Sequence, residues 1–380
     1  MIRGTGVTDC SMNTKSRICF AIYDYSSYGG VESVGVNIAN AFAEDFDVYF
    51  LGFFGEADSK HLRLNDTVKR RILLSEGIRK KRLREQIRAA KNPLRNFIET
   101  EKIDLFVLLG HYPAALAVLA KKKLRMPFVF CDHGAIANQW KDKKATLIRY
   151  VASKMCEKTV VLTEKSYMDY LKRFHILPNK ITYIYNWIEP LESDSRQYSL
   201  KTHKLLSVGR LSAEKGFDQL INAMKSVVQR HPDWSLDIYG DGDEEATLRE
   251  MIHDACLEGS ITLKGRCDRV RDLFKNYAAY IMPSYREGLP IALLEAKMNM
   301  LPIVSFDIDT GPREIVRNGV DGILVEPENI QALSEAINRL IEDEWMRKNY
   351  SEHAKGNLHL FAKEAILPQW DNLFRELLKK

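Results

Sequence analysis

The sequence lacks any run of about 18 or more uncharged apolar residues, the minimum length for a helix that spans a membrane. Its first 17 residues, Met1 to Arg17, also lack the apolar segment of a secretory signal. We therefore expect residues 1–16 to be a disordered leader, or the result of a start codon assigned too far upstream. Six cysteines occur without a pairing pattern or a C-x-x-C motif, which favours buried or idle thiols in a cytoplasmic protein.

Acidic charge is scarce in the first half of the chain. Residues 1–190 carry 31 Lys and Arg against 20 Asp and Glu, whereas residues 191–380 carry 25 against 31. Most of the basic excess lies in Lys60–Arg95, where four apolar residues fall near helical spacing: Ile78, Leu83, Ile87 and Leu94. This pattern fits a membrane-surface helix attracted to anionic lipid, a solvated helix face or a nucleic-acid patch. The stretch has almost no aromatic residue for base stacking, so we expect no nucleic-acid partner.

Short apolar segments alternate with helical patterns along the whole chain. The segments that we predict as strands are Arg17–Tyr23, Asp47–Gly52, Leu105–Leu109, Pro127–Cys131, Thr159–Leu162, Ile181–Tyr185, Lys204–Val208, Trp234–Tyr239, Ile261–Lys264, Tyr280–Pro283, Pro302–Phe306 and Gly322–Val325. Short buried strands separated by helices indicate parallel sheets that are covered on both faces. A chain of 380 residues is long enough for two such units.

The predicted fold class is therefore α/β, with two doubly wound, Rossmann-like domains facing a cleft. We place the first domain at residues 17–189, a polar linker at 190–203 and the second domain at 204–362. The remaining residues, 363–380, form a helical region long enough to return to the first domain. In open sheets of this kind, ligands bind at the carboxyl ends of the strands.

Two carboxylates, Glu287 and Glu295, stand eight positions apart around Gly288-Leu289-Pro290. The second lies on an apolar segment that reads as a helix, and Pro290 suits the first turn of that helix. A helix N-terminus presents free N–H groups and a partial positive charge, which suits a diphosphate. The arrangement predicts a binding site for a sugar nucleotide, in which backbone amides bind the diphosphate and a carboxylate binds the ribose hydroxyls. Taken alone, the motif equally fits two ordinary solvated glutamates.

Basic residues follow the first predicted strand of the second domain. Arg210 comes directly after it, and Lys215 follows five residues later, before a helix. A guanidinium and an ammonium on one loop can neutralise a leaving diphosphate without a metal ion. The alternative for Lys215 is a surface turn residue.

The first domain offers two further candidates. Gly29 and Gly30 lie between the first strand and the first helix, where glycine permits a positive φ and close approach to a ligand. The G-x-G-x-x-G fingerprint of dinucleotide binding is absent. His133 follows a buried strand in Asp132-His133-Gly134. A lone histidine is more often a satisfied structural residue, but the strand end and the adjacent glycine strengthen the case for a role at the cleft.

Three Asp-x-Asp pairs are present, at Asp45 and Asp47, at Asp241 and Asp243, and at Asp307 and Asp309. Such pairs can hold a divalent metal ion at a nucleotide diphosphate. We interpret the last two pairs as structural, since the first of them caps a helix in a glycine turn and the other lies after the candidate site. We accordingly expect no metal site.

In combination, these motifs resemble the family 4 retaining glycosyltransferases, of the type that builds bacterial surface polysaccharides and has the GT-B fold. The resemblance rests on Gly29-Gly30, His133-Gly134, Gly209-Arg210-Leu211, Glu214-Lys215-Gly216, Gly240-Asp241-Gly242, Glu287-Gly288-Leu289-Pro290, Glu295 and Gly311-Pro312-Arg313-Glu314-Ile315. Residues 44–104 match no motif of the family. Asn186-Trp187 departs from it, because a small residue usually follows the asparagine.

The resemblance implies a role for each motif of the second domain. Arg210 and Lys215 would hold the donor diphosphate, and Glu295 would bind the ribose hydroxyls. Glu287 would lie at the transferred sugar, supported by the amides of Gly288 and Leu289.

The remaining motifs would complete the site from both domains. His133 would contact the sugar from the first domain, and Gly30, next to Gly29, would leave room for the diphosphate. Gly265 and Arg266 would border the base.

The implied reaction is retaining transfer of a hexose or N-acetylhexosamine from a nucleoside-diphosphate sugar, preferably a UDP-sugar, without a further cofactor. The acceptor would be a hydroxyl of a glycan or lipid-linked oligosaccharide in capsule, exopolysaccharide or lipopolysaccharide synthesis. The enzyme would be cytoplasmic, with peripheral membrane contact through Lys60–Arg95. The alternatives are a nucleotide-sugar epimerase of the same fold and a non-catalytic protein that binds nucleotide sugars.

Overall fold

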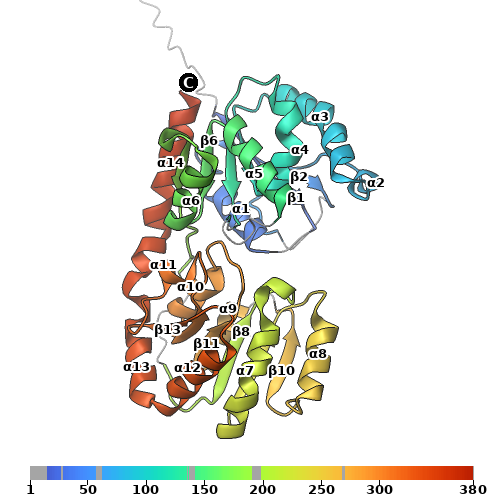
Figure 1. The fold of residues 1–380 in the computed structure, drawn as a ribbon. Helices are drawn as coiled ribbons and strands as arrows, with labels where there is room; N and C mark the ends of the chain where they lie inside the picture. The colour runs from blue at the N-terminus through green and yellow to red at the C-terminus, as the bar shows by residue number, and fades with distance from the viewer. Residues whose placement is uncertain are drawn as a thin grey trace, which may run out of the picture.

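The computed structural model describes residues 15–26, 29–56, 62–134, 136, 142–190, 198–267 and 270–379. Residues 1–14 of the expected leader and 191–197, half of the expected linker, therefore lie outside the described residues. The described chain forms two α/β units, one above the other in Figure 1, each built around one parallel sheet. This arrangement confirms the predicted fold class.

The first sheet has seven strands in the order β3-β2-β1-β4-β5-β6-β7. All of its pairings are parallel. Its strands are β1 (Arg17–Asp24), β2 (Asp47–Phe54), β3 (Lys69–Ile72), β4 (Leu105–Leu109), β5 (Phe128–Asp132), β6 (Lys158–Val161) and β7 (Ile181–Tyr183). Its helices are α1 (Gly30–Ala41), α2 (Glu76–Arg79), α3 (Leu83–Thr100), α4 (His111–Lys121), α5 (Lys143–Met155) and α6 (Glu164–Phe174), followed by the 3-10 turn η1 (Pro178–Lys180). The strand order reverses between β1 and β4, which is where such sheets bind ligands.

The second sheet repeats this plan with six parallel strands in the order β10-β9-β8-β11-β12-β13. Its strands are β8 (Lys204–Val208), β9 (Ser235–Tyr239), β10 (Ile261–Gly265), β11 (Ala279–Met282), β12 (Ile303–Phe306) and β13 (Gly322–Val325). Its helices are α7 (Phe217–Arg230), α8 (Glu245–Asp254), α9 (Val270–Leu273), α10 (Ile291–Met298), α11 (Pro312–Ile315), α12 (Ile330–Glu342) and α13 (Glu344–His353). The 3-10 segments are η2 (Ala213–Lys215), η3 (Phe274–Asn276) and η4 (Ala354–Phe361). The reversal lies between β8 and β11, so the loops after these strands meet at one edge.

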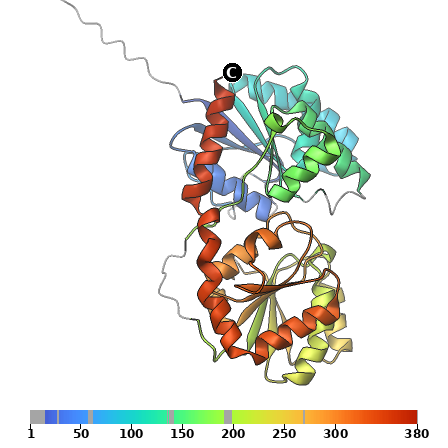
Figure 2. The same ribbon diagram turned by 60° about the vertical axis from the view of Figure 1, so that its left-hand side comes forward.

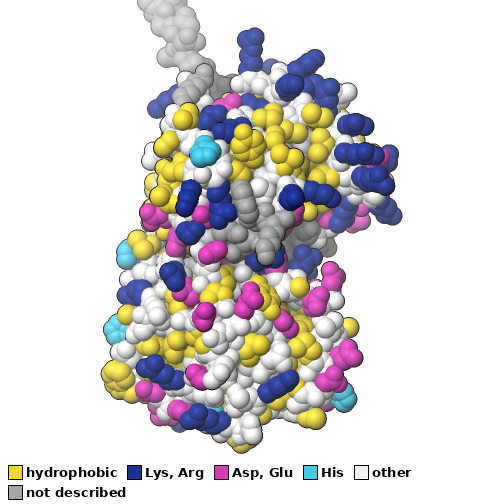
Figure 3. Space-filling model, viewed as in Figure 1, with side chains coloured by type: hydrophobic (Ala, Val, Ile, Leu, Met, Phe, Trp, Pro, Cys, Tyr) yellow, Lys and Arg dark blue, Asp and Glu magenta, His cyan; other side chains and the backbone are white. Residues whose placement is uncertain are grey.

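The basic stretch folds differently from the expectation of an apolar stripe on a basic surface. It contains the edge strand β3, which the sequence pattern did not predict, followed by α2 and α3. Leu94 is fully buried, and Ile78, Leu83 and Ile87 pack against the same core cluster as Leu94. The stripe therefore faces the core, and the segment presents basic charge without an apolar surface. Figure 3 shows this charge as Lys and Arg side chains gathered over α2 and α3.

The C-terminal helix α14 (Lys363–Leu378) belongs to the second half of the chain but packs on the first sheet. Figures 1 and 2 show it running from beside the second unit to beside the first. Phe374 is fully buried and makes edge-on ring contacts with Phe20, Phe42 and Phe46. Trp187, the unusual residue after Asn186, is buried in this same cluster. The Ile188 amide also donates to the carbonyl of Phe361, just before α14. The chain thus crosses between the units at two adjacent places, near residue 188 and at the start of α14.

Among the helices of the described residues, none combines the length and apolar composition that a bilayer crossing requires.

The packing of α14 generates a stability prediction. Replacing Phe374 with alanine should lower the free energy of unfolding by about 3–5 kcal/mol, because it leaves a cavity among three aromatic rings. The measurement is chemical denaturation of the full chain. Asn372→Ala, on the exposed face of the same helix, is the control and should cost less than about 0.5 kcal/mol. Equal losses in the two variants would contradict the assignment of α14 to this core.

Candidate functional site

Lys215 and Glu287 meet at the edge of the second sheet. The Lys215 Nζ lies 2.7 Å from the Glu287 Oε1, and the Ser284 hydroxyl donates to the same oxygen at 2.8 Å. Burial lowers the pKa of Lys215, but the Glu287 carboxylate more than offsets this effect, so the pKa lies above its usual value. The raised pKa keeps the Lys215 ammonium charged at neutral pH, and both side chains of the pair are partly buried.

The turn before α7 is held in place by backbone geometry that only glycine permits. Gly216 has a φ of 65°, and a Cβ atom there would lie 2.1 Å from the carbonyl oxygen of Pro283. The amide of Tyr285 also donates to the carbonyl of Glu214 at 2.9 Å. The loop that carries Lys215 is thus seated against the segment that leads to Glu287, which explains how residues 72 positions apart form an ion pair.

Arg210 is placed at the same edge by the ends of three adjacent strands. The Gly209 amide donates to Tyr239, the Leu211 amide donates to Asp241, and the Gly240 amide donates to Gly265. These bonds tie the loops after β8, β9 and β10 to one another. Arg210 and Arg266 are both exposed on these loops, whereas the Asp241-Gly-Asp243 segment serves the turn itself. The structure therefore brings Arg210, Lys215 and Gly265 to one edge.

Gly288 and Leu289 lie where the two units touch. A Cβ atom on Gly288 would be 2.3 Å from the carbonyl oxygen of His133, so the two backbones are in direct contact. Within the described residues, the amides of Gly288 and Leu289 donate no hydrogen bond. Pro290 is the N-cap of α10, one position earlier than the predicted first turn. Two free N–H groups therefore precede the helix, as an anion site requires.

Glu295 lies on α10, within the second unit. Its carboxylate is 3.6 Å from the Arg271 guanidinium, and its side chain is 16% exposed. Burial raises the pKa of Glu295 to about 7, and Arg271 lowers it only in part. Among the described residues, no hydrogen bond or ion pair joins Glu295 to the Lys215–Glu287 pair. The sequence pattern missed Arg271.

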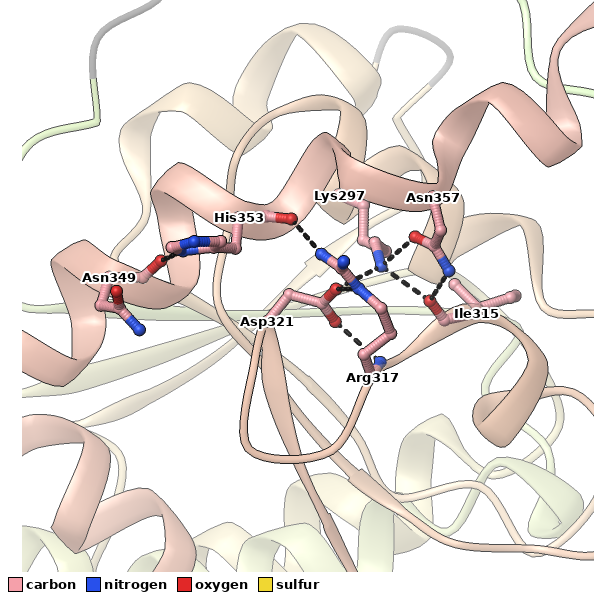
Figure 4. Close-up of polar contacts among 7 residues, drawn as sticks. All are labelled: Lys297, Ile315, Arg317, Asp321, Asn349, His353 and Asn357. Atoms are coloured by element: carbon pink, nitrogen blue, oxygen red, sulfur yellow. Dashed lines mark hydrogen bonds and ion pairs between the residues drawn. The ribbon is translucent and has the colours of Figure 1, made fainter.

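A buried lysine fixes the position of α10. Lys297 is fully buried and donates to the Asp321 carboxylate at 2.8 Å, to the Ile315 carbonyl at 2.7 Å and to the Asn357 side chain at 2.6 Å. The Arg317 guanidinium donates to the same Asp321 carboxylate oxygen at 2.6 Å (Figure 4). A buried cation is costly unless it is paired and fully hydrogen-bonded, as it is here. The network holds α10, and with it Glu295, against α11 and η4.

Gly29 and Gly30 lack the positive φ that the sequence predicted. Gly29 is extended, with a φ of −168°, and Gly30 begins α1, so neither needs a positive φ. A Cβ atom on Gly30 would meet nothing within 4 Å, which leaves open space at the start of α1. Glu32, in the first turn of α1, lies close enough to Arg210 for the arginine to lower its pKa, although burial raises that pKa overall. No motif in the sequence points to Glu32.

His133 enters the interface from the first unit with a buried ring nitrogen. Its Nε2 has no hydrogen-bond partner among the described residues. Burial lowers the pKa of His133 to about 4, against the opposing charge of Asp132, so the ring is neutral at pH 7. A neutral imidazole with an unsatisfied nitrogen beside Gly288 suits a ligand hydroxyl, because buried polar atoms are rarely left without partners.

The residue before His133 is anchored by side chains that the sequence did not reveal. The Asp132 carboxylate accepts hydrogen bonds from Arg149 and from Tyr170, each at 2.7 Å, and all three residues are buried. Burial would raise the pKa of Asp132, but Arg149 and Tyr170 hold it below the usual value. The helical periodicity of α5 and α6 could have flagged both residues as inward-facing polar groups.

Glu314 connects the two units on another side of the interface. Its carboxylate accepts from the amide of Glu164, at the start of α6, at 3.3 Å. Burial raises its pKa, and hydrogen bonds from Tyr185 and α6 oppose that shift. This residue of the Gly-Pro-Arg-Glu motif therefore caps a helix of the opposite unit.

Comparison with known proteins identifies the family of the chain. Residues 191–357 match the family model "Glycosyl transferases group 1", and residues 28–190 match "Glycosyltransferase Family 4". Together the two matches run from residue 28 to residue 357. The chain belongs to the family 4 glycosyltransferases.

Two curated relatives show the level of similarity. An uncharacterized glycosyltransferase of Haemophilus influenzae is 27% identical over 94% of this chain and 99% of its own length. The amylovoran biosynthesis glycosyltransferase AmsD of Erwinia amylovora is 29% identical, over 77% of this glycosyltransferase and 81% of its own length. These relatives support a glycosyltransferase in bacterial polysaccharide biosynthesis and do not favour the epimerase alternative.

A solved structure confirms the GT-B fold. Staphylococcus aureus TarM, crystallised with UDP and other ligands, superimposes with a TM-score of 0.82 at 16% identity and covers 94% of this glycosyltransferase and 99% of TarM.

Among the described residues, no group of three or more His, Cys, Asp or Glu side chains is placed to hold a metal ion. The Asp307 carboxylate is paired with Arg313, and Asp47 is paired with Lys69.

The anchoring of Asp132 generates a second prediction. Arg149→Met should lower the free energy of unfolding by about 3–5 kcal/mol, because it leaves a buried carboxylate without its cation. Tyr170→Phe should cost about 1–3 kcal/mol through one lost hydrogen bond. Chemical denaturation measures both, with Tyr167→Phe on the same helix as the control. A Tyr170→Phe variant as stable as the Tyr167→Phe control would argue against the network.

Proposed function

We propose that this glycosyltransferase transfers a hexose or N-acetylhexosamine from a UDP-sugar to a hydroxyl of a glycan or lipid-linked oligosaccharide, with retention at the anomeric carbon. The main observation behind this proposal is the Lys215–Glu287 ion pair of 2.7 Å. Lys215 lies beside the loop that carries Arg210, and Gly288, next to Glu287, contacts His133 of the other unit. The UDP present in the TarM crystals supports the choice of nucleotide.

The charges of the site suit the departure of a diphosphate. Arg210, Lys215 and the free amides of Gly288 and Leu289 would stabilise the negative charge that develops on the leaving phosphate oxygen. Lys215 is already paired with Glu287, so an incoming diphosphate would share this ammonium group. We assign the neutralisation of the leaving diphosphate to these groups.

Retention follows from attack on the face that the diphosphate leaves. The bond between the anomeric carbon and the phosphate oxygen would break as the acceptor oxygen bonds to the same face. The acceptor proton would pass to the departing phosphate oxygen. Glu287, held by Lys215 and Ser284, would orient sugar hydroxyls from one unit, and the Nε2 of His133 would contact the sugar from the other. Glu287 acting as a covalent nucleophile is the alternative route to retention.

Calorimetric binding of UDP and GDP, each with EDTA and with Mg²⁺, tests the donor assignment. We expect UDP to bind more tightly than GDP and to bind equally well with EDTA. Arg210→Ala should weaken UDP binding about 10- to 100-fold, since one charge-assisted hydrogen bond contributes about 1.5–3 kcal/mol. Arg249→Ala, an exposed arginine on α8, is the matched control. Preference for GDP, a requirement for Mg²⁺ or an unaffected Arg210→Ala variant would contradict the proposed site.

The raised pKa of Glu295 predicts a pH dependence. Ribose hydroxyls donate to the carboxylate and favour its charged form, so nucleotide binding must displace a proton when the pH lies below about 7. Affinity for UDP should fall by up to tenfold per unit as the pH decreases below 7, and should level off above pH 8. Glu295→Gln should remove this dependence and leave only the titration of UDP itself. Identical pH profiles for the two proteins would show that Glu295 does not bind the ribose.

A further inference from the structure

Exposed apolar side chains of the described residues are concentrated in the first unit. Of the eight large ones, five lie there: Tyr112, Leu147, Tyr150, Met168 and Leu177. None lies in the described part of the basic stretch, residues 62–95, so that stretch provides charge alone. Figure 3 shows hydrophobic side chains over α4 and α5 on the face toward the viewer.

Helix α5 has one face turned to the core and the opposite face turned to solvent. Its buried residues are Ala145, Arg149, Ala152 and Ser153. Its exposed residues include Lys143, Leu147, Tyr150 and Lys154, at positions that fall within an arc of about 60° on a helix of 100° per residue. Leu147 is 61% exposed and Tyr150 is 42% exposed. Two apolar side chains are thus framed by lysines at both ends of one stripe.

The end of α6 extends this surface. Lys154 donates to the carbonyl of His175 at 3.1 Å, and Lys180 donates to the carbonyl of Lys154 at 3.3 Å. Leu177 lies between His175 and Lys180 in the chain, and its side chain is 64% exposed. Tyr150 also contacts Phe174, with ring centroids 5.6 Å apart. We name this surface the α5 patch; it consists of Lys143, Lys144, Leu147, Tyr150, Lys154, Leu177 and Lys180.

Nearby acidic groups do not cancel this positive charge. Asp142 caps the start of α5 by accepting from the amides of Lys144 and Ala145. Glu157 is paired with Lys121 and accepts from the amide of Phe128. Among the described residues, no ion pair neutralises the four lysines of the patch, and the hydrogen bonds of Lys154 and Lys180 go to uncharged carbonyls. Their positive charge therefore remains available to an external anion. Lysines that surround Leu and Tyr side chains match the boundary between anionic head groups and acyl chains.

We propose that the α5 patch docks on the anionic surface of a lipid bilayer. The inner face of the same helix holds Asp132 through Arg149, so the docked surface lies about one helix diameter, roughly 10 Å, from the loop that carries His133. A lipid-linked acceptor could then present its sugar at the interface while its lipid stays in the bilayer. This choice of acceptor rests on the proposed function, whereas docking does not.

Vesicle flotation of the full chain tests the proposal. Phosphatidylcholine vesicles with 30 mol% phosphatidylglycerol, an amount on the order of that in anionic membranes, should bind the protein at least tenfold more strongly than pure phosphatidylcholine. Leu147→Ser/Tyr150→Ser and Lys143→Glu/Lys144→Glu should each weaken binding about tenfold or more. Lys80→Glu/Lys81→Glu, which reverses the same charge on the basic stretch, is the control and should change binding less than about threefold.

Three outcomes would overturn the proposal. These are no flotation of the wild-type protein, equal flotation with neutral vesicles, and equal loss in the α5 and control variants. Thermal unfolding of each variant establishes that the fold is retained. Calorimetric binding of UDP to the same variants separates the two claims: unchanged UDP binding with lost flotation supports docking, whereas absent UDP binding in the wild type would count against the proposed function alone.

Discussion

The backbone contact between Gly288 and His133 fixes how the two halves of this glycosyltransferase face each other. Each half delivers its polar residues to the carboxyl edge of a parallel sheet, where the strand order reverses. A Cβ atom on residue 288 would lie 2.3 Å from the His133 carbonyl oxygen, so any side chain there would push the edges apart. This contact brings the Lys215–Glu287 pair of the second unit and the unsatisfied His133 nitrogen of the first unit to the same interface.

Both loops at this contact are anchored by buried charge. Behind Gly288, the Lys297 network holds α10 against α11 and η4. Behind His133, Arg149 and Tyr170 hold Asp132. Such pairs add little net stability compared with apolar packing, but the loss of one partner is expensive, so they specify a single arrangement. Helix α5 has a double role in this view, because its inner face carries Arg149 and its outer face carries the α5 patch.

The sequence predicted the fold well because parallel sheets produce short apolar runs with a recognisable spacing. Leu105–Leu109, Lys204–Val208 and Gly322–Val325 were predicted with their exact bounds. The edge strand β3 was not predicted, because Lys69, Arg70 and Arg71 show no apolar pattern. The stripe from Ile78 to Leu94 was placed on the surface because periodicity shows that a helix has an apolar face but not what covers it. Arg149, Arg271 and Glu32 were missed because a sequence pattern does not show which partner each side chain meets in the fold.

Hydrogen–deuterium exchange with and without UDP tests the central claim, that the donor lies at the edge of the second sheet against His133. The account predicts that UDP slows exchange in residues 209–216 and 287–295, with a smaller effect at residues 132–134. Slower exchange confined to the first unit, or no change in residues 287–295 at saturating UDP, would contradict it.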